Sequence, residues 1–159
     1  MSASLSINTD GELHSLTNAA LGLLARREYS RGELFERLSR RSENAVLVEQ
    51  VLESLQEQGL QSDQRFVEHF VRYRIGQGKG PIKIRQDLRQ KAVSDELIRL
   101  HLDQDTEFWS EKAEELYHRK YGQNALKDDK DFAKRLRFMV SRGFQAHLVY
   151  PLIERFKSA

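Results

Sequence analysis

The sequence predicts an all-α protein made of three tandem three-helix repeats, which together form an elongated, curved helical array. Three observations predict this fold. Only two prolines, Pro81 and Pro151, occur in the 159 residues, so long helical segments are permitted. Clusters of β-branched residues, which favour strands, are scarce. The third observation is a weak internal repeat of about fifty residues, a period typical of helical repeat proteins.

The repeat is defined by apolar positions that recur at the same spacing. It can be anchored on Leu38, Leu88 and Met139, which are 50 and then 51 residues apart. Ten and fourteen residues after the anchors come Val48 and Leu52, Ile98 and Leu102, and Val149 and Ile153. These two positions lie one helical turn apart and share one face of a helix. The repeat therefore predicts units at 15–60, 61–104 and 105–159, preceded by a flexible segment at 1–14.

Local signals predict three helices in the first unit. The first helix lies within roughly 15–27, the second begins with a capping box at Ser30 and Glu33, and the third runs over about 43–58 until Gly59 ends it. The side chains expected to face the core are Ala19, Ala20, Leu23, Leu24, Leu34, Phe35, Leu38, Val48, Val51, Leu52 and Leu55.

The same signals recur in the second and third units. Asp63 caps a helix that the glycine-rich stretch 76–80 breaks, Pro81 suits the first turn of the next helix, and Ser94 caps the third. The third unit begins with a helix over 106–121. Asp128 and its acidic neighbours favour the start of the next helix, Gly143 ends it, and Pro151 falls inside the last one. The helix that begins at Asp63 carries Phe66, Phe70 and Tyr73. The side chains expected to face the core in the other helices are Ile84, Leu88, Leu97, Ile98, Leu102, Trp109, Ala113, Leu116, Tyr117, Phe132, Leu136, Met139, Val149, Leu152, Ile153 and Phe156.

The charges are segregated along the chain, although the net charge is only +2. Basic blocks at 26–41, 65–91 and 119–142 alternate with acidic blocks at 42–64 and 94–118. A basic stripe of this kind favours binding to a polyanion or to an acidic protein surface, although solvated helix faces would produce the same pattern. The candidate binding residues are Arg65, Arg72, Arg74, Lys79, Lys83, Arg85, Arg89, Lys91, Arg135 and Arg142.

Nothing in the sequence indicates a catalytic, cofactor or metal site, so we expect a protein that is not an enzyme. The chain has no cysteine, and residues 76–80 lack the spacing of a phosphate-binding loop. Glu115 and His118 match one half of a helical di-iron motif whose second half is missing. No apolar run approaches the roughly 20 residues that span a bilayer, and no secretory signal is evident, so a cytoplasmic protein without membrane contact is expected.

Four aromatic residues allow two interpretations. The side chains of Trp109, Tyr73, Tyr117 and Tyr121 could stack on nucleic-acid bases. At helical spacing such residues more often belong to the core.

Residues 62–93, SDQRFVEHFVRYRIGQGKGPIKIRQDLRQKAV, resemble the central signature of the RecX family. The matching positions are Asp63, Arg65, Phe66, Phe70, Arg74, Gly78, Gly80, Pro81, Ile84, Arg85, Gln86, Leu88 and Lys91. The third unit adds Trp109, Lys112, Ala113, the stretch 119–122 and the turn 142–144. Two positions depart from the family pattern. Ala92 stands where members often have glycine, and Arg41-Ser42 stands where a glycine is expected, so helix ends without a left-handed glycine cap are predicted there.

The resemblance implies a fold of three tandem three-helix units and a regulatory function. A member of this family is expected to restrain the RecA recombinase by binding along the groove of the RecA–DNA filament, which inhibits ATP hydrolysis, strand exchange and filament extension. The implied partners are the RecA filament and single- or double-stranded DNA, the latter bound weakly alone, and the implied state is a monomer. The alternative is a helical-repeat protein that binds DNA directly, without RecA.

Overall fold

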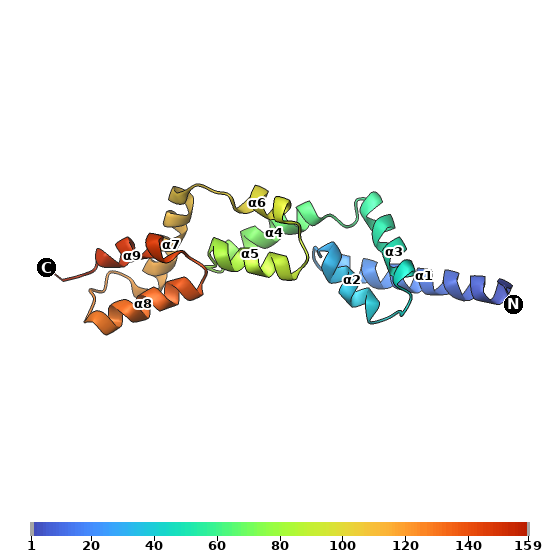
Figure 1. Cartoon of the computed structure of the whole chain (residues 1–159), viewed down its shortest axis with the longest axis horizontal. Coiled ribbons are helices and arrows are strands. Elements are labelled where there is room, and N and C mark those ends of the chain that lie inside the picture. The colour runs from blue at the N-terminus through green and yellow to red at the C-terminus, as the bar shows by residue number, and fades with distance from the viewer. Residues whose placement is uncertain (1, 159) are drawn as a thin grey trace. The chain divides into compact units, whose positions relative to one another are not determined.

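The computed structural model describes residues 2–158, and these residues form helices and no strand (Figure 1). The first helices are α1 (Ser2–Leu24), α2 (Arg31–Ser39), α3 (Ala45–Glu57) and α4 (Asp63–Gly76). They are followed by α5 (Pro81–Gln90), α6 (Asp95–Leu102), α7 (Thr106–Tyr121), α8 (Asp129–Ser141) and α9 (Ala146–Glu154). The prediction of an all-α helical array is confirmed. None of these helices combines the length and apolar character needed to cross a membrane.

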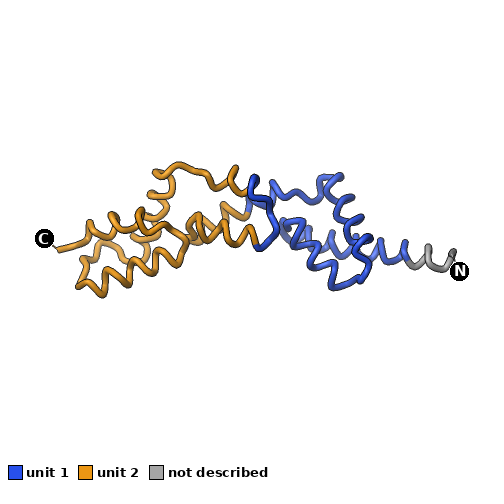
Figure 2. Tube along the Cα trace, viewed as in Figure 1, with its two compact units in different colours: residues 1–69, 90–97 blue, residues 70–89, 98–159 orange. Residues whose placement is uncertain are grey.

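The chain divides into two compact units (Figure 2). The first contains residues 1–69 and 90–97, and the second contains residues 70–89 and 98–159. Both α4 and α6 therefore contribute residues to each unit. The boundaries of the three expected repeats stay a prediction, because these units follow a different division of the chain.

The first unit has a core formed by α1, α2 and α3. Its fully or almost fully buried side chains are Leu16, Ala20, Tyr29, Leu34, Leu38, Leu47, Val48, Val51, Leu52 and Leu55. The predicted capping box at the start of α2 is confirmed: the Glu33 amide donates to the Ser30 hydroxyl at 3.0 Å, and the Ser30 amide donates to the Glu33 carboxylate at 3.1 Å. Phe35 was expected in this core, but it is 37% exposed.

The N-terminal helix is longer than the sequence indicated. A flexible segment at 1–14 and a helix within 15–27 were expected, whereas α1 spans Ser2–Leu24. The physical reason lies in contacts made before residue 15. The Ser42 hydroxyl donates to the Glu12 carboxylate, and Leu13 packs against the core of the first unit. No proline interrupts this stretch, so the helix can extend through it.

The second unit is built around buried residues of α5, of α7–α9 and of the turn between α8 and α9. They include Ile84, Leu88, Trp109, Ala113, Tyr117, Met139, Phe144, Val149, Leu152 and Ile153. The predicted span of α7 agrees with the structure, and the Asp128 carboxylate accepts from the Asp131 amide at 2.8 Å to cap α8. Pro151 lies inside α9, as predicted.

Two turns of the second unit meet through their backbones. The Gly80 amide donates to the Arg142 carbonyl at 2.7 Å, and the Ile82 amide donates to the Gly143 carbonyl at 3.0 Å. The first turn of α5 thus obtains acceptors for amides that its own helix cannot satisfy. The approach is possible because position 80 lacks a side chain: a Cβ there would lie 2.5 Å from the Gly143 carbonyl carbon.

The turn after α5 keeps a left-handed residue although it lacks the expected glycine. Ala92 has a φ of 60°, a conformation that disfavours any residue with a Cβ. The helix end lacks a glycine cap, as predicted, but the left-handed conformation is kept by an alanine. At the other departure, after α2, the buried Ser42 accepts from the Asn44 amide at 3.1 Å and bonds to Glu12.

The contact between the two turns predicts that replacing Gly80 by alanine destabilises the protein, whereas replacing Gly76 by alanine does not. Gly80→Ala should lower the free energy of unfolding by about 3 kcal/mol, because the new Cβ meets backbone atoms that cannot move independently. Gly76→Ala is the matched control, since a Cβ there meets nothing within 4 Å, and it should be neutral or slightly stabilising. Urea denaturation of both variants measures the difference, and equal losses would contradict the close approach.

The strained alanine predicts a stabilising substitution. Ala92→Gly should raise the free energy of unfolding by about 0.5 kcal/mol, because relief of the left-handed strain exceeds the added entropy of the unfolded chain. Ala133→Gly, inside α8, is the control and should lower it by about 1 kcal/mol. Chemical denaturation gives both signs, and a loss at both positions would show that Ala92 is unstrained.

Candidate functional site

The structure distributes the ten candidate basic residues over both compact units. Arg65 and Lys91 belong to the first unit. The remaining eight belong to the second unit: Arg72, Arg74, Lys79, Lys83, Arg85, Arg89, Arg135 and Arg142. Because the two units are separate bodies, each group is considered within its own unit.

Arg135 is a structural residue and not part of an exposed surface. It is only 3% exposed, and its guanidinium donates to the Tyr117 hydroxyl at 2.6 Å, to the carbonyls of Asn124 and Ala125, and to Asp131. Burial alone would lower the pKa of this guanidinium, but the hydrogen bonds with Tyr117 and Asp131 outweigh burial and hold the pKa above its ordinary value. Arg135 therefore joins the loop after α7 to α8. Because its side chain is buried, we no longer count it among the residues that could contact a binding partner.

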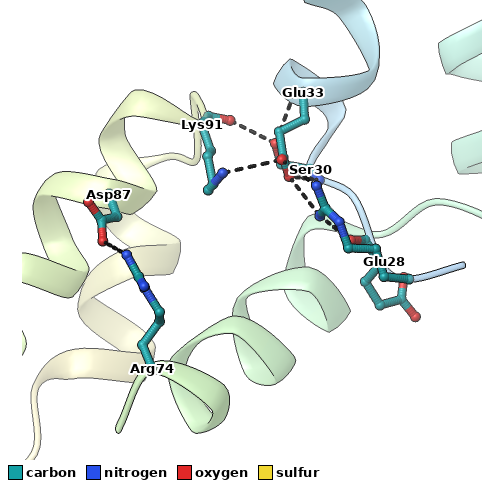
Figure 3. A network of polar contacts seen from close by, with 7 residues as sticks. Glu28, Ser30, Glu33, Arg74, Asp87 and Lys91 are labelled. Atoms are coloured by element: carbon teal, nitrogen blue, oxygen red, sulfur yellow. Dashed lines mark hydrogen bonds and ion pairs between the residues drawn. The ribbon is translucent and has the colours of Figure 1, made fainter. Parts of the chain in front are cut away.

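The two basic residues of the first unit also have partners within the protein. The Arg65 Nε donates to Glu28 at 2.6 Å, and the same guanidinium reaches the Gly59 and Leu60 carbonyls. Figure 3 shows Lys91 pointing toward Glu33, with Nζ 3.2 Å from the carboxylate, while the Lys91 carbonyl accepts from the Ser30 hydroxyl at 2.9 Å. These contacts tie segments of the first unit together and use much of each residue's hydrogen-bonding capacity.

Glu33 is the centre of that arrangement. Its burial would raise the pKa of the carboxyl, but hydrogen bonds from Arg27 and the Ser30 amide and the charge of Lys91 lower the pKa below its ordinary value. The carboxylate is thus ionised at neutral pH and forms ion pairs with both Arg27 and Lys91. Lys91 therefore has a carboxylate partner within its own unit.

A different situation holds in the second unit, where positive charges exceed the carboxylates beside them. We call Arg74, Lys79, Lys83 and Arg142 the cationic cluster. Figure 3 shows Arg74 directed at Asp87, with which it forms an ion pair, and the Lys83 Nζ lies 3.8 Å from the same carboxylate. Burial lowers the pKa of Lys79, and repulsion from Arg142, Arg74 and Lys83 lowers it further, so these cations lie close enough to act on one another.

The fold holds this cluster through the two turns described above. Lys79 precedes Gly80 in one turn, and Arg142 provides the carbonyl that Gly80 binds in the other. The Arg142 guanidinium lies over the Phe138 ring at 5.2 Å, and the Lys120 Nζ lies 5.1 Å from the same ring. A Cβ on Gly78 would stand 3.4 Å from the Arg119 guanidinium. Arg119 and Lys120 were missing from the candidate set, although their position in the third basic block was a usable signal.

The other candidates lie on the helices next to the cluster. Arg72 is exposed on α4, and Arg89 is exposed on α5. Arg85 on α5 forms a long ion pair of 3.7 Å with Asp103, whose side chain is 64% exposed, so this pair holds Arg85 only weakly.

The aromatic residues considered for base stacking are separated by their burial. Trp109 and Tyr117 are core residues, 5% and 0% exposed, and Tyr121 is half-buried against Tyr117 and Arg135. Tyr73 is 64% exposed on α4. Within residues 2–158, no group of three or more histidine, aspartate or glutamate side chains is arranged to hold a metal ion.

Comparisons with known proteins identify the family of this chain. The model of the first three-helix domain of RecX matches residues 17–55, and that of the second matches residues 62–102. The regulatory protein RecX of Halorhodospira halophila is 39% identical over 135 residues, which are 85% of this chain and 84% of the relative. That of Chromohalobacter salexigens is 42% identical over 125 residues, 79% and 82% of the two chains.

Solved structures give the same result. A crystal structure of regulatory protein RecX aligns with a TM-score of 0.77 at 25% identity, over 95% of this chain and 75% of that chain. RecX from Lactobacillus salivarius shares the fold, with a TM-score of 0.76 at 20% identity over 92% and 97% of the two chains. The sequence matches cover most of this chain and most of each relative. The match to the second three-helix domain includes Arg74, Lys79 and Lys83. The chain therefore belongs to the RecX family of regulatory proteins.

Proposed function

We propose that this chain is a negative regulator of the RecA recombinase that binds along the groove of the RecA–DNA filament. Bound there, it inhibits ATP hydrolysis, strand exchange and filament extension, and thereby restrains homologous recombination and the SOS response. In this proposal it acts as a cytoplasmic monomer with no enzymatic activity and no cofactor, and it binds DNA only weakly in the absence of RecA.

The observation that carries the proposal is the cationic cluster of the second unit. Arg74 pairs with Asp87, and the Lys83 Nζ lies 3.8 Å from the same carboxylate. Lys79 and Arg142 stand on the two turns that meet at Gly80, and repulsion from the other three cations adds to burial in lowering the pKa of Lys79. An anionic partner relieves that repulsion, so the cluster favours phosphates or carboxylates over neutral surfaces. A nucleoprotein filament offers phosphates of DNA and carboxylates of its protomers along one groove, and both fit the cluster.

The rigidity of the cluster supports a role as an obstacle in the filament. Arg74 stands on α4, Lys79 in the turn before α5, Lys83 on α5 and Arg142 in the turn after α8. Backbone hydrogen bonds of Gly80 and Ile82 join the start of α5 to the turn after α8, and the Lys79 amide donates to the Arg74 carbonyl at 3.0 Å. A preorganised surface loses little conformational entropy on binding. The chain can then hold neighbouring protomers in one arrangement and occupy the groove that strand exchange needs.

The RecA ATPase on single-stranded DNA tests the function directly. The rate is measured while this chain is titrated at substoichiometric ratios to RecA. Strong inhibition well below one copy per protomer supports a block to filament extension, because simple competition for DNA would need more protein. No inhibition at any ratio, with binding to DNA intact, would favour the alternative of a protein that acts on DNA without RecA.

The cluster itself is tested by charge reversal. The double variant Lys79→Glu/Arg142→Glu should raise the half-inhibitory concentration at least tenfold, since it converts the net charge of the cluster and Asp87 from positive to negative. If DNA phosphates are the ligands, the slope of log affinity against log salt should also become shallower by about 2. The ATPase assay at several salt concentrations measures both effects.

The matched control is Lys130→Glu/Lys134→Glu, which changes the charge of the second unit equally at two exposed positions of α8. The control should inhibit like the unmodified chain, and circular dichroism should show that both variants are folded. Equal loss in both variants would mean that total charge, and not the cluster, drives the interaction.

A further inference from the structure

One exposed aromatic side chain stands beside the cationic cluster and has no evident role in packing. Tyr73 is 64% exposed, the largest exposure among the aromatic residues that are exposed in the described part of the chain. It occupies the position before Arg74 in the last turns of α4. A single exposed ring is common on protein surfaces, so its significance here comes from its contacts with the cationic cluster.

Hydrogen bonds couple the tyrosine to the cluster. The Gln77 Nε2 donates to the Tyr73 hydroxyl at 3.0 Å, and the Arg74 guanidinium donates to the Gln77 Oε1 at 3.0 Å. The other end of the Arg74 guanidinium pairs with Asp87. These contacts restrain the phenol at its hydroxyl end, leave the ring exposed and connect it through Gln77 to Arg74 of the cationic cluster.

An exposed ring next to cations matches the chemistry of an unpaired nucleotide. The base has a flat apolar face that can stack on the phenol, while the adjacent phosphates can reach Arg74, Lys79 and Lys83. In a duplex the bases are stacked on one another and their faces are hidden, so the ring would have nothing to stack on. A tyrosine in this position therefore distinguishes single strands from duplexes, which the cations alone cannot do.

We propose that Tyr73 is a stacking platform for an unpaired base and makes the cationic cluster selective for single-stranded DNA. This inference rests on the proposed function in that both use the cluster, and it deepens that function by naming the form of DNA that the cluster takes. Gln77 is a positioning residue, since it holds the phenol hydroxyl and the Arg74 guanidinium in one arrangement.

The test uses the full-length chain and fluorescently labelled oligonucleotides in the absence of RecA. Three probes of equal length are compared by fluorescence anisotropy at low salt: an oligodeoxythymidylate, a duplex, and a strand of abasic sites that keeps the phosphates. Tyr73→Ala should weaken binding of the oligodeoxythymidylate about tenfold, because one base–ring stack is lost. Binding of the duplex and of the abasic strand should stay within about twofold, since neither offers a free base face.

Two further variants separate stacking from a structural role. Tyr73→Phe keeps the ring and loses only the hydroxyl that Gln77 binds, so it should retain most of the affinity for the oligodeoxythymidylate. Tyr150→Ala removes another exposed tyrosine of the second unit, whose ring packs against Phe132, and should leave all three affinities unchanged. If Tyr73→Ala weakens all three probes equally, Tyr73 acts only through Arg74 and the proposal is overturned.

Failure of this inference and failure of the proposed function give different results. If Tyr73→Ala binds the oligodeoxythymidylate as tightly as the unmodified chain does, or if the unmodified chain binds no single strand, the stacking platform is wrong. The RecA ATPase titration is read separately and still decides the regulatory function. If the Lys79→Glu/Arg142→Glu variant loses inhibition of RecA while Tyr73→Ala inhibits as the unmodified chain does, the regulatory function is supported and base stacking by Tyr73 is not needed for it.

Discussion

The close backbone contact between the turn before α5 and the turn after α8 is the constraint on which the candidate site depends. Two amides of the α5 start, those of Gly80 and Ile82, donate to the carbonyls of Arg142 and Gly143. This contact brings Lys79 and Arg142, which are about sixty positions apart in the sequence, onto one surface. Without it, Arg142 would have no defined place beside Lys79, and its charge would be a separate surface charge screened by solvent.

The cluster also shows how like charges can be concentrated without destabilising a small domain. Asp87 pairs with Arg74 and lies 3.8 Å from the Lys83 ammonium, so part of the repulsion is offset locally. The remaining positive charge acts on Lys79: burial lowers the pKa of its ammonium group, and repulsion from the neighbouring cations lowers it further. In the first unit both candidate cations have a carboxylate partner, because Lys91 shares Glu33 with Arg27 and Arg65 pairs with Glu28. Basic residues that look equivalent in the sequence therefore differ in what they have left to offer a partner.

The elements that the sequence predicts well are those set by local interactions. The capping box at Ser30 and the span of α7 depend on neighbours within a few residues, and both agree with the structure. Arg135 could not be assigned in this way, since its burial depends on the carbonyls of Asn124 and Ala125 and on the Tyr117 hydroxyl, which tertiary packing brings together. The length of α1 was missed for the same reason, because Ser42 lies thirty residues from Glu12. The composition of the candidate surface was predictable, but its division into compensated and uncompensated charges was not.

Charge and shape supply different parts of recognition at this surface. The field of the cluster extends over about 10 Å at moderate salt and attracts any polyanion, whether duplex, single strand or acidic protein. Discrimination needs a contact of shorter range that one ligand can make and another cannot. Tyr73 is placed for such a contact, since Gln77 holds its hydroxyl and shares Arg74 with the cluster. Attraction by the cations and selection by the ring would then act on the same stretch of DNA, because one arginine belongs to both.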